Sequence, residues 1–232
     1  MENLQLVLPE IFLSLSIMFL LILGAFKKDS SKLIHNLSLS LLIVTATISF
    51  NETIGISETK LFNNSVIIDY FSSLMKIITL LAAFLVLTIS SNYLKTFQIF
   101  KIEYPILILS SVLGMMVMIS SNDLIVFYMG LELQSLALYV LATFNRDQLN
   151  SSEAGLKYFV LSALSSGLLL YGCSLIYGFT GSTNFNLIAN QLNSNEYALT
   201  FGIVFILVGL AFKISAVPFP VSYTHLRAHE TS

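Results

Sequence analysis

The sequence has 232 residues, of which 56% are hydrophobic and only 10% charged, and its mean hydropathy is +0.84. No soluble domain of this length buries so much apolar surface, so lipid must solvate part of the chain. The 11 basic and 13 acidic residues leave a net charge of −2, which is too balanced for a nucleic-acid-binding or polybasic membrane-surface protein.

Seven apolar stretches are long enough to cross a bilayer, whose core takes about 20 helical residues. They lie at about 9–26, 31–50, 68–91, 104–121, 124–144, 153–179 and 198–219, and short polar linkers join them. The sequence therefore predicts an all-α fold, a polytopic membrane helical bundle of about seven transmembrane helices.

Three of these spans carry a signal for the start of a helix. Pro9-Glu10 places a proline in the first turn and an acid at the positive end of the helix dipole, and Tyr104-Pro105 opens the fourth span likewise. Asn150 followed by Glu153 predicts an N-cap with its reciprocal acid at the start of the sixth span.

Basic residues are distributed unequally between the loops. The N-terminus and the second, fourth and sixth loops hold only Lys60. The first, third and fifth loops hold the others outside the spans and the tail: Lys27, Lys28, Lys32, Lys95, Lys101 and Arg146. By the positive-inside rule, we expect the N-terminus outside and the odd-numbered loops in the cytoplasm or matrix.

Two charged residues inside predicted spans are candidates for a functional role. Glu132 is about 12–14 Å into the fifth span, counted from Leu124. Lys213 stands one turn before Pro218, which interrupts helical hydrogen bonding. Intramembrane acids and bases often mark proton pathways, so we expect Glu132 and Lys213 to pair. The alternatives are a protonated glutamate bonded to a backbone carbonyl and a lysine that snorkels to the interface.

Two further lysines are more ambiguous. Lys157 follows Glu153 by four residues, in the favourable order for a helical ion pair, and the two form either an ordinary helix-end pair or part of a proton relay. Lys76 shares a helix face with Asp69, and we expect it to snorkel or pack near the outer interface. The small residues at 162–167 predict close helix packing.

The sequence shows no pattern for a bound cofactor or metal. It has no glycine-rich nucleotide loop and no cysteine cluster for iron–sulfur, and its single cysteine is Cys173. His225 and His229 have a spacing that can bind zinc on a helix, but no third ligand accompanies them. We therefore expect no cofactor and no metal on this chain.

Four segments resemble a known family. The first is LPEI at 8–11, and the second is the long run at 120–183, which begins with SSNDLIVFYMGLELQSL and ends with GFTGST. The third, EAGLKYF at 153–159, lies within that run, and the fourth is GLAFKISAVPF at 209–219. Over about residues 4–219 the sequence is similar to subunit N of the proton-translocating NADH–quinone oxidoreductase (respiratory complex I), one of its antiporter-like membrane subunits.

The resemblance implies a role for each intramembrane charge. Glu132 and Lys213 match the charged pair of a proton half-channel, Lys157 matches the family's connecting lysine with Glu153 beside it, and the seventh helix is broken where SAVPF stands. It further implies NADH, FMN, iron–sulfur clusters and quinone elsewhere in the complex, other complex I membrane subunits and lipid as partners, and proton translocation coupled to electron transfer. The expected location is the bacterial inner (plasma) membrane, with the mitochondrial inner membrane as the alternative.

The resemblance stops at Pro220, where the family usually continues with His-Met-Trp-x-Pro-Asp and further spans. We expect residues 1–219 to form the N-terminal half of an antiporter-like membrane domain, and 220–232 to be a non-native or disordered tail joined to a truncated gene. A short genuine tail is the alternative. Two other functions stay open: a subunit of a cation/proton antiporter or membrane-bound hydrogenase, and a non-catalytic scaffold whose charges only fix helix packing.

Overall fold

The computed structural model describes residues 5–27, 30–53, 58–96, 99–145, 148–191 and 196–214. It divides the chain into two compact units, which are treated separately below. Unit 1 comprises residues 1–122 and 129–141, and unit 2 comprises residues 123–128 and 142–232. Helix α6 contributes to both, because its first five residues and its last residue, Ala142, belong to unit 2 and residues 129–141 to unit 1.

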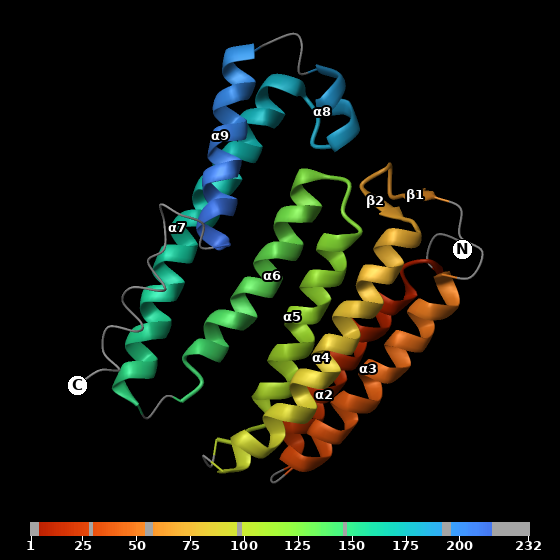
Figure 1. Ribbon diagram of the computed structural model, residues 1–232, viewed down its shortest axis with the longest axis vertical. Coiled ribbons are helices and arrows are strands. Elements are labelled where there is room, and N and C mark those ends of the chain that lie inside the picture. The colour runs from red at the N-terminus through yellow and green to blue at the C-terminus, as the bar shows by residue number, and fades with distance from the viewer. Residues whose placement is uncertain are drawn as a thin grey trace. The chain divides into compact units, whose positions relative to one another are not determined.

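Unit 1 is built from long apolar helices and one small hairpin (Figure 1). Its helices are α2 (Leu8–Phe26), α3 (Ser31–Thr53), α4 (Tyr70–Thr96), α5 (Glu103–Ile119) and most of α6 (Leu124–Ala142). Helix α2 begins as the sequence predicted, with a proline in its first turn and Glu10 at the positive end of its dipole.

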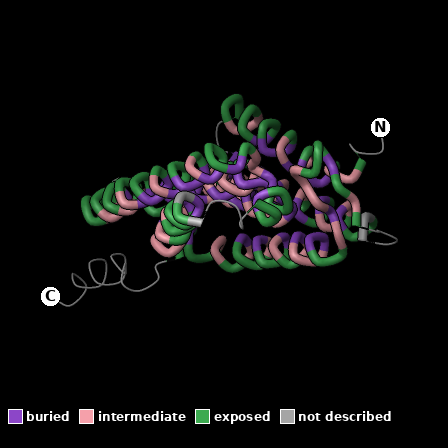
Figure 2. The backbone as a smooth tube through the Cα atoms, turned by 90° about the horizontal axis from the view of Figure 1, so that it is seen from above, coloured by how far each residue is buried: buried purple, intermediate pink, exposed green. Residues whose placement is uncertain are grey.

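The core of unit 1 lies between α2, α3, α4 and α5. Buried side chains recur every three or four residues on each helix, so that one side faces inward and the other stays exposed (Figure 2). The core residues are Leu13, Ile17, Leu20, Ile34, Leu42, Leu80, Ala83, Leu87, Ile106, Leu109, Val112 and Met116. The exposed side is equally apolar, as expected of helices that face lipid.

Helices α5 and α6 meet backbone to backbone at two glycines. A Cβ atom at Gly114 would lie 2.6 Å from the backbone nitrogen of Gln134 and 2.7 Å from the carbonyl oxygen of Gly130. A Cβ atom at Gly130 would lie 2.8 Å from the backbone nitrogen of Met118. Only residues without a side chain allow this approach, which fixes α6 against α5 within unit 1.

A β-hairpin occupies much of the polar linker that was predicted between the second and third spans. Strands β1 (Thr59–Leu61) and β2 (Val66–Ile68) pair antiparallel, with Lys60 opposite Ile67. The turn passes through positive φ angles at Phe62, Asn63 and Asn64. The Asn122 side chain donates to the Asn64 carbonyl at 2.8 Å, which ties the hairpin to the end of α5.

Helix α4 follows the hairpin directly and is capped reciprocally. The Asp69 carboxylate accepts a hydrogen bond from the Ser72 backbone nitrogen at 2.7 Å, and the Ser72 hydroxyl accepts one from the Asp69 nitrogen at 2.9 Å. Two backbone N–H groups at this helix start, which have no partner within the helix, are thereby bonded. The hairpin and this cap place the start of α4 beside the end of α5.

Unit 2 consists of α7 (Leu149–Thr180), α8 (Phe185–Gln191) and α9 (Glu196–Lys213), together with the first five residues and the last residue of α6. Helix α7 ends at Gly181, whose φ of 67° allows the left-handed C-cap. The Asp123 carboxylate caps the start of α6 by accepting from the Ile125 backbone nitrogen at 2.8 Å, and it also accepts a hydrogen bond from the Thr183 hydroxyl.

The membrane-helix prediction is confirmed, with changes at the boundaries. Five helices are long and apolar enough to span a bilayer, and Glu103–Ile119 and Leu199–Lys213 are shorter apolar helices, so each predicted span contains one. The predicted cap at Asn150 is wrong: α7 begins at Leu149 after Gln148, which makes no side-chain cap, and Asn150 lies in the first turn. The predicted break at Pro218 and the 220–232 tail lie outside the described residues.

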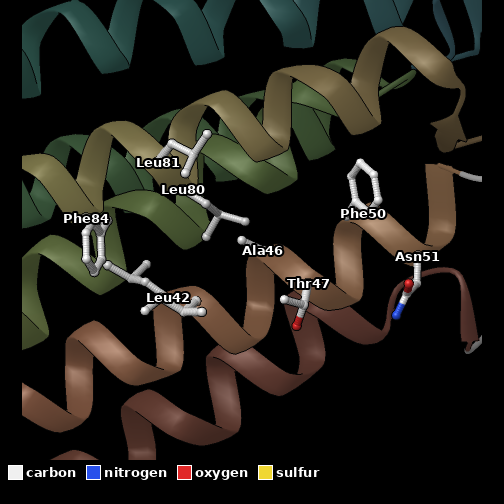
Figure 3. Close-up of a pocket in the computed structure, with 9 residues that line it drawn as sticks. Leu42, Ala46, Thr47, Phe50, Asn51, Leu80, Leu81 and Phe84 are labelled. Carbon is white, nitrogen blue, oxygen red and sulfur yellow. The ribbon is translucent and has the colours of Figure 1, made fainter.

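A groove of about 420 Å³ runs between α3 and α4 (Figure 3). Its lining is apolar except for Thr47 and Asn51. Leu42, Ala46 and Leu80 point into it from the two helices. The lining contains no ionisable side chain, so the groove offers no group that could carry a proton.

Candidate functional site

Glu132 is placed near the middle of α6, in unit 1. It is the ninth residue of a 19-residue helix, about 12 Å from its start, and it is half-buried. Gly130 and Gln134 lie on the face of α6 that contacts α5. At about 100° per residue, Glu132 lies roughly opposite that face. Glu132 therefore lies near the middle of this candidate membrane span, on the side of α6 turned away from α5.

Lys213 and Lys157 belong to unit 2, where α7 and α9 pack antiparallel in a fixed register. The Ser165 hydroxyl donates to the Gly209 carbonyl at 2.8 Å. About two turns further along α7, a Cβ atom at Gly172 would lie 2.8 Å from the Gly202 carbonyl oxygen. These two contacts hold α9 against α7 through small residues and one interhelical hydrogen bond.

This register places the two lysines close together along the helix axis. Because Ser165 lies opposite Gly209, Lys213 lies level with Leu161, which is one turn beyond Lys157. The axial separation of the two lysines is therefore about 6 Å. Lys213 is the last residue of α9, is half-buried, and follows Gly209 by one turn on the face that contacts α7.

The predicted pair of Glu153 and Lys157 is confirmed. The Lys157 Nζ atom lies 2.5 Å from Glu153 Oε1, and the two residues have the predicted helical spacing of four. Their side chains are 55% and 56% exposed, so the pair sits on the surface of unit 2 as described. They are the fifth and ninth residues of α7, near the N-terminal end of that helix.

The structure thus brings three of the four predicted site residues into one unit. Lys157 pairs with Glu153 on the exposed surface of α7, and Lys213, on the α7–α9 seam, is about one turn away along the helix axis. Glu132 lies in the other unit, and its pairing with Lys213 stays a prediction. The small-residue prediction is correct for Ser162, Ser165 and Ser166, which are buried, whereas Gly167 is exposed and the close approaches are made by other glycines.

A second intramembrane ion pair was missed by the sequence analysis. Lys76 Nζ on α4 lies 2.5 Å from Glu10 Oε1 on α2, and the two side chains are only 3% and 8% exposed. Of the two alternatives expected for Lys76, snorkelling is wrong and packing is correct, because the side chain is buried inside unit 1. The available signal was an acid and a base, each within an apolar span and far from its charged neighbours in sequence.

No cluster of three or more potential metal ligands occurs among the described residues. His225 and His229, the candidate zinc pair, lie outside that part of the chain.

Residues 121–222 match a family model described as NADH:quinone oxidoreductase/Mrp antiporter, TM. Over 219 residues the chain is 69% identical to NADH-quinone oxidoreductase subunit N of Pelagibacter ubique (strain HTCC1062). The chain belongs to the subunit N family. It is also 52% identical over 222 residues to subunit N of Bartonella bacilliformis, and each comparison covers 94% of the chain.

The chain spans about half the length of these subunit N relatives, namely 46% and 45%. Respiratory complex I from Thermus thermophilus contains a chain with the same fold, at a TM-score of 0.75 and 25% identity, covering 91% of this chain and 45% of that one. The Mrp complex from Dietzia sp. DQ12-45-1b is similar in fold alone, at a TM-score of 0.74 and 22% identity, covering 95% and 42%.

Proposed function

We propose that this chain is the N-terminal part of a membrane subunit of a proton-translocating NADH–quinone oxidoreductase. Its role is to move protons through the membrane when electron transfer from NADH to quinone, carried out by other subunits, changes the charges next to it. Its partners are the other membrane subunits of the complex and the lipid bilayer. The chain itself carries no redox centre in this proposal.

One observation carries the proposal more than any other. The segment that matches the family model, residues 121–222, contains all four predicted relay residues. Two of them, Glu132 and Lys213, lie within apolar helices and are half-buried, and an ionisable residue there requires a purpose because a charge at membrane depth is costly. Proton transfer is a function that needs acids and bases at that depth.

The geometry of the described units supports a role for each residue. Glu132 is the acid at mid-membrane depth. Lys213 is a base on the α7–α9 seam, about one turn from Lys157. In the proposed relay, Glu132 and Lys213 exchange a proton with each other, and Lys213 exchanges one with Lys157.

Glu153 has a positioning role in this relay. Its carboxylate holds the Lys157 ammonium at 2.5 Å near one end of α7, where the pair is exposed. The contact fixes where the Lys157 ammonium lies on the surface of α7.

A cation/proton antiporter is the second candidate, because the Mrp complex shares the fold. The fold is common to both functions, so it does not separate them. The 69% and 52% identities to subunit N favour the oxidoreductase.

The proposal is tested by substitutions in the full-length protein within the assembled complex, reconstituted into vesicles. Glu132→Gln and Lys213→Ala remove one protonatable group each, and both are expected to depress proton translocation and the quinone reduction coupled to it. Glu132→Asp keeps an acid on the same helix face and is expected to do less harm. If Glu132→Gln and Lys213→Ala both translocate protons and reduce quinone at the parent rates, Glu132 and Lys213 are structural charges only.

Lys60→Ala provides a matched control. Lys60 is also a lysine in an ion pair, with Glu58 at 3.6 Å, but it lies exposed on the hairpin. Its removal is expected to leave both rates unchanged. A drop as large as that of Lys213→Ala would show that loss of any lysine disturbs the complex.

The proposed orientation places the N-terminus outside, in the bacterial inner membrane. Single cysteines introduced at Lys101 and at Asn63 test it by labelling with a membrane-impermeant reagent. Asn63 lies in the hairpin turn and is expected to label from outside, and Lys101 from the cytoplasm. The reverse pattern contradicts the orientation.

A further inference from the structure

The buried pair of Glu10 and Lys76 has an incomplete hydrogen-bonding shell. Glu10 Oε1 contacts Lys76 Nζ at 2.5 Å, whereas Glu10 Oε2 is buried and has no hydrogen-bond partner among the described residues. A buried carboxylate oxygen without a donor is unfavourable, so native proteins rarely leave one. The atom therefore requires a donor that the described side chains do not supply, and a water molecule or a proton on the carboxyl group itself meets this need.

The location of the pair favours exchange with water. Glu10 is the third residue of α2 and Lys76 the seventh of α4, so both lie within two turns of the helix start. Ser72 and Ser73 precede Lys76 by one turn on the same face of α4, and both are buried. Half-buried Asp69 begins this helix and bonds to Ser72. Polar groups therefore line α4 from its start to the ion pair.

Stability alone does not account for the pair. Replacing a buried ion pair by apolar side chains of similar volume is often neutral or stabilising, because desolvation of two charges offsets their attraction. Glu10 and Lys76 stand in helices whose neighbouring core is apolar. Ionisable residues in such a setting are best explained by chemistry.

The geometry points to a second proton-holding site, in which Glu10 and Lys76 bind and release a proton through Glu10 Oε2 near the end of unit 1 that carries the hairpin. This inference rests on the proposed proton-translocating function and adds a site separate from Glu132, Glu153, Lys157 and Lys213. Uptake of a proton from water forms an O–H bond at Oε2 and neutralises the carboxylate. The Lys76 ammonium is then buried without a counter-charge.

The cycle closes without any other reactant. Lys76 Nζ loses one proton to water, which leaves a neutral acid beside a neutral amine. The acid then gives its proton to Nζ, so an O–H bond breaks, an N–H bond forms and the ion pair is restored. One proton has entered at Glu10 and one has left from Lys76.

A double substitution separates this role from a structural one. Glu10→Met with Lys76→Met, made in the full-length protein of the assembled complex, removes both charges and leaves no buried charge unpaired. We expect assembly at the parent level, judged by native gel electrophoresis, together with a loss of proton translocation in vesicles. Translocation at the parent rate would overturn the inference.

Two further variants complete the test. Glu58→Met with Lys60→Met replaces an exposed ion pair by the same residues, and it is expected to leave translocation unchanged. If the buried methionine pair fails to assemble, Glu10→Gln with Lys76→Met is measured in the same way, and failure of that variant to assemble shows a structural role and overturns the inference.

Lys213→Ala distinguishes the two proposals. If Lys213→Ala abolishes translocation while the buried methionine pair does not, only the second site is wrong. If Lys213→Ala translocates protons at the parent rate, the proposed relay itself fails.

Discussion

Substitution of Gly114 by alanine tests whether close backbone contact fixes α6, and with it Glu132, in unit 1. The new Cβ atom would lie 2.6 Å from the backbone nitrogen of Gln134, about 0.8 Å short of ordinary contact at 3.4 Å. This nitrogen and the Gly130 carbonyl oxygen, which would lie 2.7 Å away, are both backbone atoms of α6, so no side chain can rotate away. The helices must separate, and we expect overpacking of this kind to cost about 1–3 kcal/mol.

A matched substitution isolates that cost. Gly167 also lies inside a helix, but a Cβ atom there meets nothing within 4 Å. Alanine is favoured over glycine in a helix interior by up to about 1 kcal/mol, and this gain applies equally to both positions. The difference between Gly114→Ala and Gly167→Ala in the free energy of unfolding is therefore the overpacking cost alone.

The assay is reversible unfolding of the full-length protein by SDS in mixed micelles, followed by circular dichroism. We expect Gly114→Ala to unfold at a lower SDS fraction than the parent or at a similar one, and Gly167→Ala at the same or a higher one, with a difference of about 1–3 kcal/mol between them. Equal midpoints for the two variants would refute the reasoning, because they would show that α5 and α6 separate without cost.

Three other substitutions are measured by the same unfolding assay. Asp123→Ala removes the N-cap of α6 and should lower the free energy of unfolding by about 0.5–2 kcal/mol, whereas Asp123→Asn, which keeps a capping oxygen, should restore most of it. Ser165→Ala removes the interhelical bond to Gly209 and should cost about 0.6 kcal/mol, so a loss above about 2 kcal/mol would indicate that the seam has repacked. Glu153→Gln breaks an exposed pair and should cost at most about 0.5 kcal/mol, and a larger effect would contradict its surface position.

Features that depend on local sequence were predicted well. The start of α2 follows from Pro9 and Glu10, and the pair of Glu153 and Lys157 follows from a spacing of four residues on one helix. The cap at Asn150 failed because α7 extends four residues further toward the N-terminus than the apolar stretch, through polar residues that periodicity does not assign to a helix.

Features that depend on contacts between helices could not be predicted, for a reason specific to membrane proteins. Leu13 is fully buried and Leu15 is 65% exposed, yet both are leucines, because the lipid-facing side of a span is as apolar as its core. Hydrophobic pattern therefore does not tell which face of α2 meets α4, and Glu10 could not be matched with Lys76. The hairpin escaped prediction because its strands have three residues each and its turn contains no glycine.

The length of α7 sets a condition on how this protein sits in its membrane. Its 32 residues extend about 48 Å, whereas the hydrocarbon core is about 30 Å thick. Even at a tilt of 40°, near the upper limit for membrane helices, α7 would still project about 37 Å along the bilayer normal. A change in bilayer thickness must alter either the tilt of α7 or the part of it that leaves the hydrocarbon.

Lys157 is only the ninth residue of that helix, so its depth changes with either adjustment. In a thicker bilayer the lysine and its glutamate are drawn toward the hydrocarbon, and in a thinner one they emerge into the headgroup region. Hydrophobic mismatch thereby couples the acyl-chain length of the surrounding lipid to the solvation of this ion pair. Lipid composition thereby changes the solvation of the Glu153–Lys157 pair without any direct contact between a lipid and these side chains.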